Sequence, residues 1–525
     1  MGRGRATFIR LLLAGVLAAA GVTAEVRAQN APLPDGPPIT NVPPRDGGGS
    51  NNHHNNKAVW YVVGGVAVAI VGWMIGTRVF NPDPPQSNQP PVIPPFDPVS
   101  LPAPGQNPPP TRGQGKQGNQ SNQGNQSNPG GTANLRNGFN LPPIGETRFV
   151  QNEVMLDIPS SVPTATLDAM AGRHGMTRLE TRTFRLTGRT LHRWRLDAGT
   201  TVVDMIRTLT REQQIAGAQP LYLFELAQDM SGSTAGLVNG DQYAPEKLGL
   251  TEAHRLATGN RVLVAVIDSG VDASHPDLAG AVVDNLDAAN DNAPHAHGTG
   301  MAGAIAAHRS MLGTAPRVGL LTVRAFGTRP NSADGTTFNI IKGLDWAVER
   351  GARVINMSFA GPPDPRLRDA LARVAKKGVV LVAAAGNAGP QSPPLYPAAD
   401  PNVIAVTATD MDDKLFSGAN RGTYIAVAAP GVDILAPSVG GTYQLTTGTS
   451  VASAQVSGVA ALLIERNPAL TPGDVRRILT RTAKSLGPRG SERDFGSGLV
   501  DAYQAVSSAR SSGATAAAPA KTKTK

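Results

Sequence analysis

The sequence predicts an α/β protein, with a doubly wound parallel sheet over 241–509 and a small α+β domain before it over 146–228. In the larger region, apolar segments of strand length alternate with segments of helical periodicity, which is the pattern of a parallel sheet covered by helices. Two strand segments, 261–267 and 378–385, are near-continuous apolar runs, as expected of strands buried on both faces. The smaller region has its own order of elements.

That order is strand, helix, strand, strand, helix, strand, which is the ferredoxin-like arrangement. We expect strands at 150–158, 178–184, 191–196 and 220–226, with helices at 164–174 and 201–213. An unrelated small α+β domain is the alternative that the pattern leaves open.

A carboxylate ends the first buried strand of the larger region. The run 261–267 leads into Asp268, and Ser269-Gly270 then turns the chain. Open α/β sheets place their binding sites at the carboxyl ends of central strands. A single Asp-Ser-Gly is more often an ordinary turn, so this signal needs support from elsewhere in the chain.

An imidazole opens a helix of small residues. His297 is followed by Gly298-Thr299-Gly300 and a small apolar segment that continues to 307. A ring in the first turn of such a helix is held rigidly against the sheet. The other histidines that compete for a role in this region are His275, His295 and His308.

A serine opens a second apolar helix, predicted over 448–463. Unpaired backbone N–H groups and the positive end of the helix dipole favour developing negative charge at Ser450. A serine that only caps the helix is the alternative.

Together these three residues carry one chemistry. A serine hydroxyl is a weak nucleophile without a base beside it, and the base needs a carboxylate to hold its tautomer. The chain order Asp268, His297, Ser450 is that of subtilisin, and residues 241–509 resemble the subtilisin-like (subtilase) serine protease family. The resemblance implies a serine endopeptidase in which Ser450 attacks, His297 moves the proton and Asp268 orients His297.

Two further segments match the same family. The strand segment 378–385 leads into Gly386-Asn387, and the resemblance implies that the Asn387 side chain and the Ser450 backbone N–H form the oxyanion hole. A turn asparagine is the alternative. The segment 354–361 is similar to the family's substrate-binding strand, whose backbone pairs with an extended peptide. Its candidate residues are Ser358, Phe359 and Ala360.

The chain departs from the family pattern beside the nucleophile. Val451, Ala454 and Gln455 stand where the family usually has Met, Pro and His, and Ala360 stands where glycine is frequent. These changes bear on rate and selectivity, because the triad and Asn387 are all present. A binding protein built on a silenced protease fold is the competing hypothesis, and silenced copies usually lose a triad residue.

The position of the small domain also fits the family. A domain directly before a subtilisin-like domain is similar to the family's inhibitory propeptide, whose C-terminal strand end lies in the active-site cleft. Residues 229–240 are rich in Gly and Ser, which suits cleavage. We expect self-processing between about 226 and 240, and the small domain as an intramolecular inhibitor.

The N-terminal region has the features of an exported protein. Arginines followed by an apolar run predict a signal peptide at 1–28, followed by a low-complexity segment at 29–57. The uncharged stretch 58–77 is long enough for a transmembrane helix, and the basic residues before it favour a catalytic domain outside the cytoplasm. A cleaved signal peptide followed by a stop-transfer helix would instead return the later residues to the cytoplasm. Secretion after processing is a further alternative. The Pro/Gly/Asn/Gln-rich linker at 78–145 and the basic tail at 510–525 are expected to be disordered.

The composition argues against a nucleic-acid partner. Cysteine is absent, and the net charge of +9 is scattered among few aromatic residues, which argues against a nucleic-acid partner. Proteins and peptides are the expected substrates, and no cofactor or metal is expected. Asp277 matches a family position that can bind calcium, but one carboxylate is far short of a calcium cage, so a structural calcium is left open.

Overall fold

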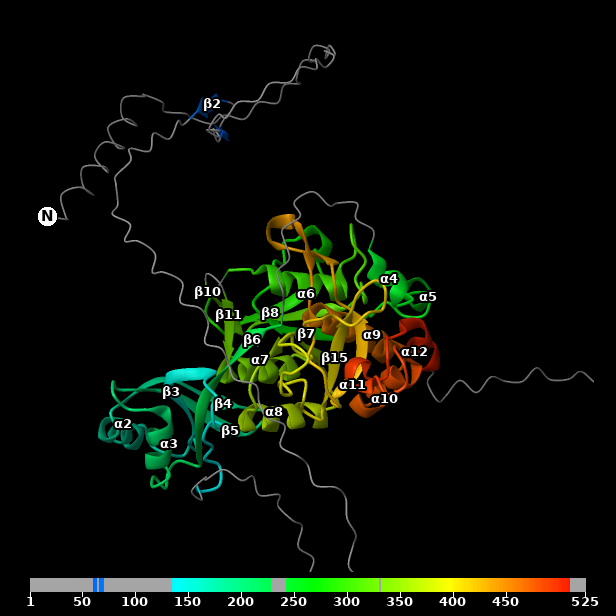
Figure 1. The fold of residues 1–525 in the computed structure, drawn as a ribbon. Coiled ribbons are helices and arrows are strands. Elements are labelled where there is room, and N and C mark those ends of the chain that lie inside the picture. The colour runs from blue at the N-terminus through cyan, green and yellow to red at the C-terminus, as the bar shows by residue number, and fades with distance from the viewer. Residues whose placement is uncertain are drawn as a thin grey trace, which may run out of the picture. The chain divides into compact units, whose positions relative to one another are not determined.

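The computed structural model describes residues 60–63, 66–69, 135–227, 242–291, 293–329 and 332–509 (Figure 1). The chain divides into two units, Met1–Ser121 and Asn122–Lys525. The second unit contains both the large and the small predicted domain, and each unit is described by itself below.

A seven-stranded sheet forms the centre of the large domain. Its order is β16-β15-β14-β12-β7-β9-β8, and every neighbouring pair is parallel. The strands are β7 (Leu263–Asp268), β8 (Val282–Asp287), β9 (Gly319–Arg324), β12 (Val354–Met357), β14 (Val380–Ala384), β15 (Val403–Thr409) and β16 (Ile425–Pro430). This confirms the predicted parallel sheet. The strand order reverses at β7, so Asp268 ends a strand at the point where such sheets bind their ligands.

Helices cover both faces of this sheet (Figure 1). On one face lie α6 (Ala296–Ala306) and α9 (Thr449–Arg466), and on the other α7 (Thr337–Glu349) and α8 (Pro365–Lys376). Alternate residues of β7 enter the two apolar cores: Val264 and Val266 pack with α6 and α9, whereas Ala265 and Ile267 pack with α7. This two-sided burial explains why the strand sequence is apolar without alternation.

Shorter elements complete the large domain. They are α4 (Tyr243–Lys247), α5 (Leu250–Ala253), η1 (Pro276–Leu278), β17 (Ile434–Pro437), η2 (Val439–Gly441), β18 (Tyr443–Thr446), α10 (Pro472–Thr482), α11 (Glu492–Phe495) and α12 (Ala502–Ser508). The start of α10 follows from its sequence, because Thr471 and Asp474 form a capping box and proline occupies its first position.

The small domain has the predicted βαββαβ order. Its elements are β3 (Phe149–Asp157), α2 (Thr164–Arg173), β4 (Met176–Phe184), β5 (Arg189–Leu196), α3 (Val202–Leu209) and β6 (Gly217–Leu226). The sheet runs β6-β3-β5-β4 with antiparallel neighbours. Helix α3 ends four residues before the predicted 213, because Thr210 and Arg211 turn back to Arg207 and Thr208 with shorter i to i+3 bonds.

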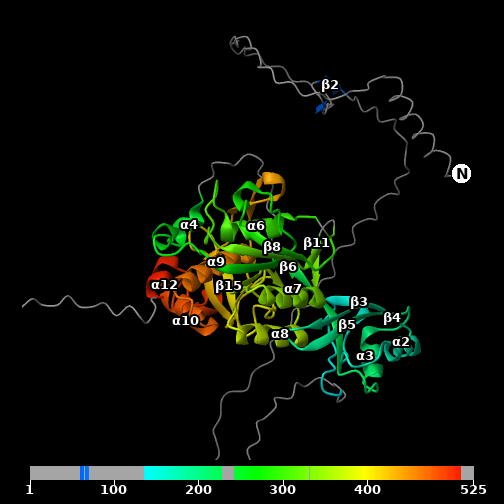
Figure 2. The ribbon, with the colours of Figure 1, turned by 180° about the vertical axis from the view of Figure 1, so that it is seen from behind.

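The two domains share a sheet. Beyond its own domain, β6 pairs with β11 (Ser332–Thr336), which pairs in turn with β10 (Phe326–Arg329), and with the short β13 (Phe359–Ala360). Helices α7 and α8 lie between the small domain and the central sheet in both views (Figure 2). One apolar core is therefore continuous from the small domain to these helices.

The end of the predicted linker differs from the expectation. Residues 135–145 are described, and Phe139 is buried with a bridge to Ala218 of β6. The Arg136 guanidinium lies over the Phe139 ring, 4.8 Å from its centroid. The prediction of a disordered linker up to 145 is therefore wrong over its last residues, because Phe139 buries apolar surface against the small domain.

The predicted transmembrane helix also differs where it is described. Within 58–77 the structure has two antiparallel strands, β1 (Trp60–Val63) and β2 (Val66–Ala69), instead of a helix. Their valines and aromatic residues favour strands, and the sequence supplies Gly64-Gly65, a common two-residue hairpin connection, between them. None of the helices in the described ranges is long and apolar enough to cross a membrane.

Other predictions fall outside the described residues. These are the signal peptide at 1–28, the segment at 29–57, the linker from 78 to 134, the processing segment at 229–240 and the tail at 510–525. The domain boundaries drawn through them stay predictions.

Candidate active site

The first predicted pair meets where β7 and α6 come together. Asp268 ends β7, and His297 is the second residue of α6. His297 Nδ1 lies 2.6 Å from Asp268 Oδ1, and both side chains are 1% exposed. An Nδ1–H that donates to the carboxylate leaves Nε2 as the basic atom of the ring. The structure therefore brings these two residues together in the arrangement of a base and its orienting carboxylate.

Ser450 lies in the first turn of α9. The N-cap of this helix is Gly448, with φ of 150°, so Ser450 is not the capping residue. The Ser450 carbonyl accepts hydrogen bonds from the hydroxyls of Ser358 at 3.0 Å and Ser453 at 2.8 Å. The backbone of Ser450 is therefore held by two hydroxyl groups, one from Ser358 of the predicted substrate-binding segment and one from Ser453 of the same helix.

Four buried polar atoms at this place have no hydrogen-bond partner among the described residues. They are Asp268 Oδ2, His297 Nε2, Asn387 Nδ2 and Ser450 Oγ. The bond expected between the serine hydroxyl and His297 Nε2 is not formed, and such bonds often tighten only when substrate binds. Buried polar groups without partners are costly in a folded protein. Their concentration at the predicted site marks it as a place that binds a polar group.

Asn387 has its amide direction set by its neighbours. The residue follows β14, and its Oδ1 accepts hydrogen bonds from the Thr449 N–H at 3.1 Å and the Thr449 hydroxyl at 2.8 Å. The Thr449 hydroxyl in turn accepts from the Gly386 N–H at 3.1 Å. With its oxygen held, Asn387 presents Nδ2 as a donor that bonds to none of the described residues. Sequence reasoning missed Thr449, although it stands directly before the serine.

The predicted substrate strand is paired with the chain itself. Phe359 and Ala360 of β13 lie opposite Leu226 and Glu225 of β6, antiparallel, and the Ala227 N–H donates to the Ser358 carbonyl at 3.2 Å. On the other side, β6 pairs with β11. The end of β6 therefore lies between two strands of the large domain. The sequence predicted one of these strands but not β11.

Asp277 does not fit a calcium ligand in this structure. Its Oδ1 accepts the backbone N–H groups of Arg309, Ser310 and Met311, and its Oδ2 accepts the Tyr443 hydroxyl at 2.6 Å. Both oxygens are thus engaged by donors, where a cation needs free lone pairs. Across the described ranges, no group of three or more His, Asp or Glu side chains is placed to hold a metal ion.

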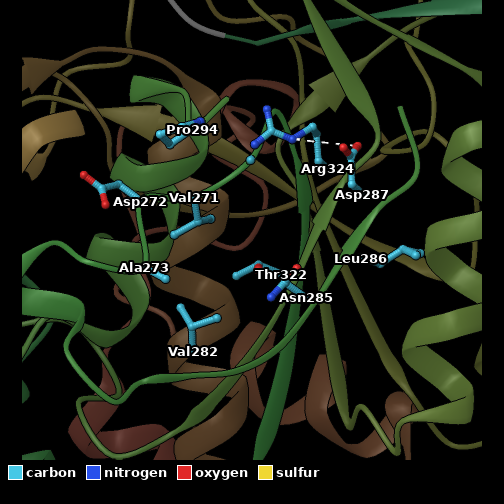
Figure 3. Close-up of a pocket in the computed structure, with 11 residues that line it drawn as sticks. Val271, Asp272, Ala273, Val282, Asn285, Leu286, Asp287, Pro294, Thr322 and Arg324 are labelled. Atoms are coloured by element: carbon cyan, nitrogen blue, oxygen red, sulfur yellow. Dashed lines mark ion pairs between the residues drawn. The ribbon is translucent and has the colours of Figure 1, made fainter. Parts of the chain in front are cut away.

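A cavity of about 250 Å³ lies at the loop that follows β7 (Figure 3). The loop after Asp268 and the carboxyl ends of β8 and β9 line it, together with Pro294. Arg324 enters it from β9, with its Nε 3.8 Å from Asp287 Oδ1, as the dashed line in Figure 3 shows. The cavity combines this cation with the carboxylates of Asp272 and Asp287, so it is not strongly selective for either sign of charge.

Comparisons with known proteins show the family of the chain. The sequence profile described as "Subtilase family" matches residues 259–498. Thermitase of Thermoactinomyces vulgaris is 38% identical over 274 residues, which cover 50% of this chain and 95% of thermitase. Subtilisin Savinase of Lederbergia lenta is 38% identical over 261 residues, 48% of this chain and 93% of the relative.

A solved structure is also similar to this chain. The crystal structure of fervidolysin from Fervidobacterium pennivorans, described as a keratinolytic enzyme related to subtilisin, matches with a TM-score of 0.60 and 25% identity. The match covers 70% of this chain and 63% of the fervidolysin chain. The family profile matches this chain, and the matches to thermitase and subtilisin Savinase cover nearly the full length of those relatives. The chain therefore belongs to the subtilase family and is a serine endopeptidase.

Proposed function

We propose that the protein cleaves peptide bonds of other proteins through Asp268, His297, Ser450 and Asn387. The observation that carries this proposal is the 2.6 Å contact between His297 Nδ1 and Asp268 Oδ1. With it go three buried polar atoms that have no hydrogen-bond partner in the described part of the chain: His297 Nε2, Ser450 Oγ and Asn387 Nδ2. These atoms are the base, the nucleophile and an oxyanion donor in one buried cluster.

The steps follow from the roles of these atoms. Ser450 Oγ attacks the carbonyl carbon while its proton passes to His297 Nε2, and Asp268 stabilises the imidazolium. The Asn387 Nδ2–H and the Ser450 backbone N–H hold the oxyanion of the tetrahedral intermediate. His297 then gives the proton to the leaving amine, which leaves an acyl ester on Ser450. Water, activated by the same imidazole, releases the acid and restores the serine.

The substrates proposed are extended segments of protein chains. Strands β11 and β13 flank the end of β6 and bond to its backbone, so they are suited to hold any extended peptide in the same manner. Binding through the backbone depends little on the substrate's side chains. We assign Ser358, Phe359 and Ala360 to this binding.

The catalytic roles are tested with casein and three forms of the full chain. Wild type is expected to digest casein, and Ser450→Ala to lose at least about 10³-fold in rate. Ser457→Ala is the matched control, because this serine lies on the same helix with its hydroxyl bonded to Asn356 and the Ser453 carbonyl. Casein loss by Ser450→Ala equal to wild type would rule out the serine as nucleophile.

We further propose that the small domain is an intramolecular inhibitor that the enzyme cuts off after Ala227. The Ala227 N–H donates to the Ser358 carbonyl, and the Ser358 hydroxyl donates to the Ser450 carbonyl. These contacts support Ala227–Gln228 as the peptide bond presented to Ser450. This position lies at the start of the range 226–240 expected from the sequence.

N-terminal sequencing of the purified protein tests the cleavage. Wild type is expected to yield a chain beginning at Gln228, and Ser450→Ala to stay whole. The same new terminus in both proteins would assign the cut to another protease. Export with a cleaved signal peptide at 1–28 is part of the same proposal.

A further inference from the structure

A second histidine is linked to the Asp268–His297 pair through Ser269. The Ser269 hydroxyl oxygen lies 3.1 Å from Asp268 Oδ1 and 2.9 Å from His295 Nδ1. The His297 backbone N–H donates to His295 Nδ1 at 3.3 Å, so His295 is the N-cap of α6. A chain of contacts therefore runs from His295 through Ser269 to the carboxylate that orients His297.

Asp268 and His295 compete for the single hydroxyl proton of Ser269. The Ser269 hydroxyl has one proton, and its oxygen already accepts the Gly298 N–H at 3.3 Å. It can donate that proton to Asp268 Oδ1 or to His295 Nδ1, but not to both. When the His295 ring is neutral and its proton is on Nε2, Nδ1 has one lone pair, which the His297 N–H at 3.3 Å and the Ser269 hydroxyl at 2.9 Å share. The hydroxyl is the closer of the two donors.

The surroundings of His295 favour the neutral ring. Burial, then the neighbouring His297 and Arg324, lower the pKa of His295, and the nearby Asp268 and Asp291 oppose this. Arg324 lies close to the same turn, because its guanidinium packs over Gly270, which lines the cavity of Figure 3 together with Pro294. A second positive charge on His295 would face this arginine.

We propose that His295 is a positioning residue that draws the Ser269 hydroxyl proton away from Asp268. Asp268 Oδ1 then keeps two donors, the His297 ring and the Ser269 N–H at 2.8 Å. A carboxylate with fewer hydrogen bonds stabilises a neighbouring imidazolium more strongly. His295 therefore makes His297 a stronger base, acting through Ser269 without touching substrate. The inference rests on the proposed roles of Asp268 and His297.

The test follows the His297 ring by NMR in the full chain carrying Ser450→Ala, which stays whole. The ring signals are identified by their absence in His297→Asn. In His295→Ala the Ser269 hydroxyl donates its proton to Asp268 instead, so the His297 ring is expected to gain its proton at a lower pH than in the parent chain. His295→Asn restores an acceptor at the N-cap and is expected to restore the original titration.

Ser269→Ala separates this role from simple capping. With Ser269→Ala present, His295→Ala is expected to leave the titration unmoved, although thermal unfolding still reports the lost cap. His308→Ala is the control, since its Nδ1 bonds to the Ala306 carbonyl at the other end of α6. No shift in His295→Ala, or an equal shift with and without Ser269, would overturn the inference. Casein digestion by the Ser450→Ala chain would instead overturn the proposed function, and the titration would still be readable.

Discussion

Asn387 performs two tasks with one amide group. Its oxygen holds the N–H and hydroxyl of Thr449, and its nitrogen is left as a buried donor. Because Thr449 directly precedes Ser450, the proposed oxyanion donor and the proposed nucleophile belong to one rigid unit. Movement of α9 relative to β14 would disturb both together.

Asn387→Ala is expected to lower kcat by roughly 10²- to 10³-fold with little change in KM, because the oxyanion forms only in the transition state. Steady-state kinetics on a chromogenic peptide measures both constants. Thr449→Val is the control: it removes the hydroxyl contact to Asn387 Oδ1 but keeps Nδ2. A loss in Thr449→Val as large as in Asn387→Ala would mean that support of α9, not donation, explains the effect.

The proposed site residues could be selected from the sequence because each follows a recognisable local pattern. Asp268 and Asn387 come directly after apolar strand runs, and His297 and Ser450 open helices of small residues. The contacts between them were less accessible. Two examples are the hydrogen bond from the Thr449 hydroxyl to Asn387 Oδ1 and the contact between the Ser269 hydroxyl and His295 Nδ1. Both depend on distances between segments that are far apart in the sequence.

Among the elements, the connection that follows α6 depends on a single carboxylate. Asp277 lies in η1, on the connection that follows β7. Its carboxylate accepts hydrogen bonds from the backbone N–H groups of 309–311 and from the Tyr443 hydroxyl of β18. Burial raises the pKa of Asp277, but these hydrogen bonds, led by that of Tyr443, outweigh burial and lower the pKa below its usual 3.8. The ionised form therefore stabilises the fold.

Asp277→Asn is expected to lower the free energy of unfolding by about 2 kcal/mol at pH 7, since an amide cannot accept all four donors. Because the folded-state pKa is depressed, the stabilisation is present above pH 3.8 and is lost as the pH falls below it. Urea unfolding of the Ser450→Ala chain at pH 7 and near pH 3 measures this. A difference between the two proteins that stays constant with pH would contradict the argument.

Elements were predictable where the sequence alone determines them. Strands β7 and β14 are apolar runs, and α10 carries its own capping box. Strand β11 was missed because Ser332–Thr336 has no apolar alternation, and it becomes a strand through its pairing with β6 and β10. The expected helix at 58–77 failed for a related reason: uncharged apolar length does not distinguish a helix from a hairpin of valines.

Across the whole second unit, the small domain is joined to the large one by buried polar contacts as well as by strands. Arg366 of α8 lies 3.2 Å from Asp157 of β3, with side chains 10% and 5% exposed. Gln219 of β6 donates to Asp364 at 2.8 Å. By contrast, Arg185 and Glu349 pair across the same interface with 79% and 46% of their side chains exposed.

Arg366→Met is expected to weaken the hold of the cleaved small domain about ten- to hundred-fold, because it leaves Asp157 buried with only one of its two arginines. The measurement is the fraction of small domain that stays with the peptidase during size-exclusion chromatography of the processed protein. Arg185→Met, at the exposed pair, is expected to change little. Equal release in both variants would show that the strand pairing alone sets the affinity.

Strand β6 covers the edges of two strands of the large domain. Without β6, strands β11 and β13 would each have unpaired N–H and C=O groups along the edge that β6 now covers. Such edges pair readily with strands of other chains and lead to aggregation. By pairing with both strands, β6 covers both edges at the time when many newly made copies are near one another. The strand that we propose as part of an inhibitor therefore also protects the edges of β11 and β13 from pairing with other chains.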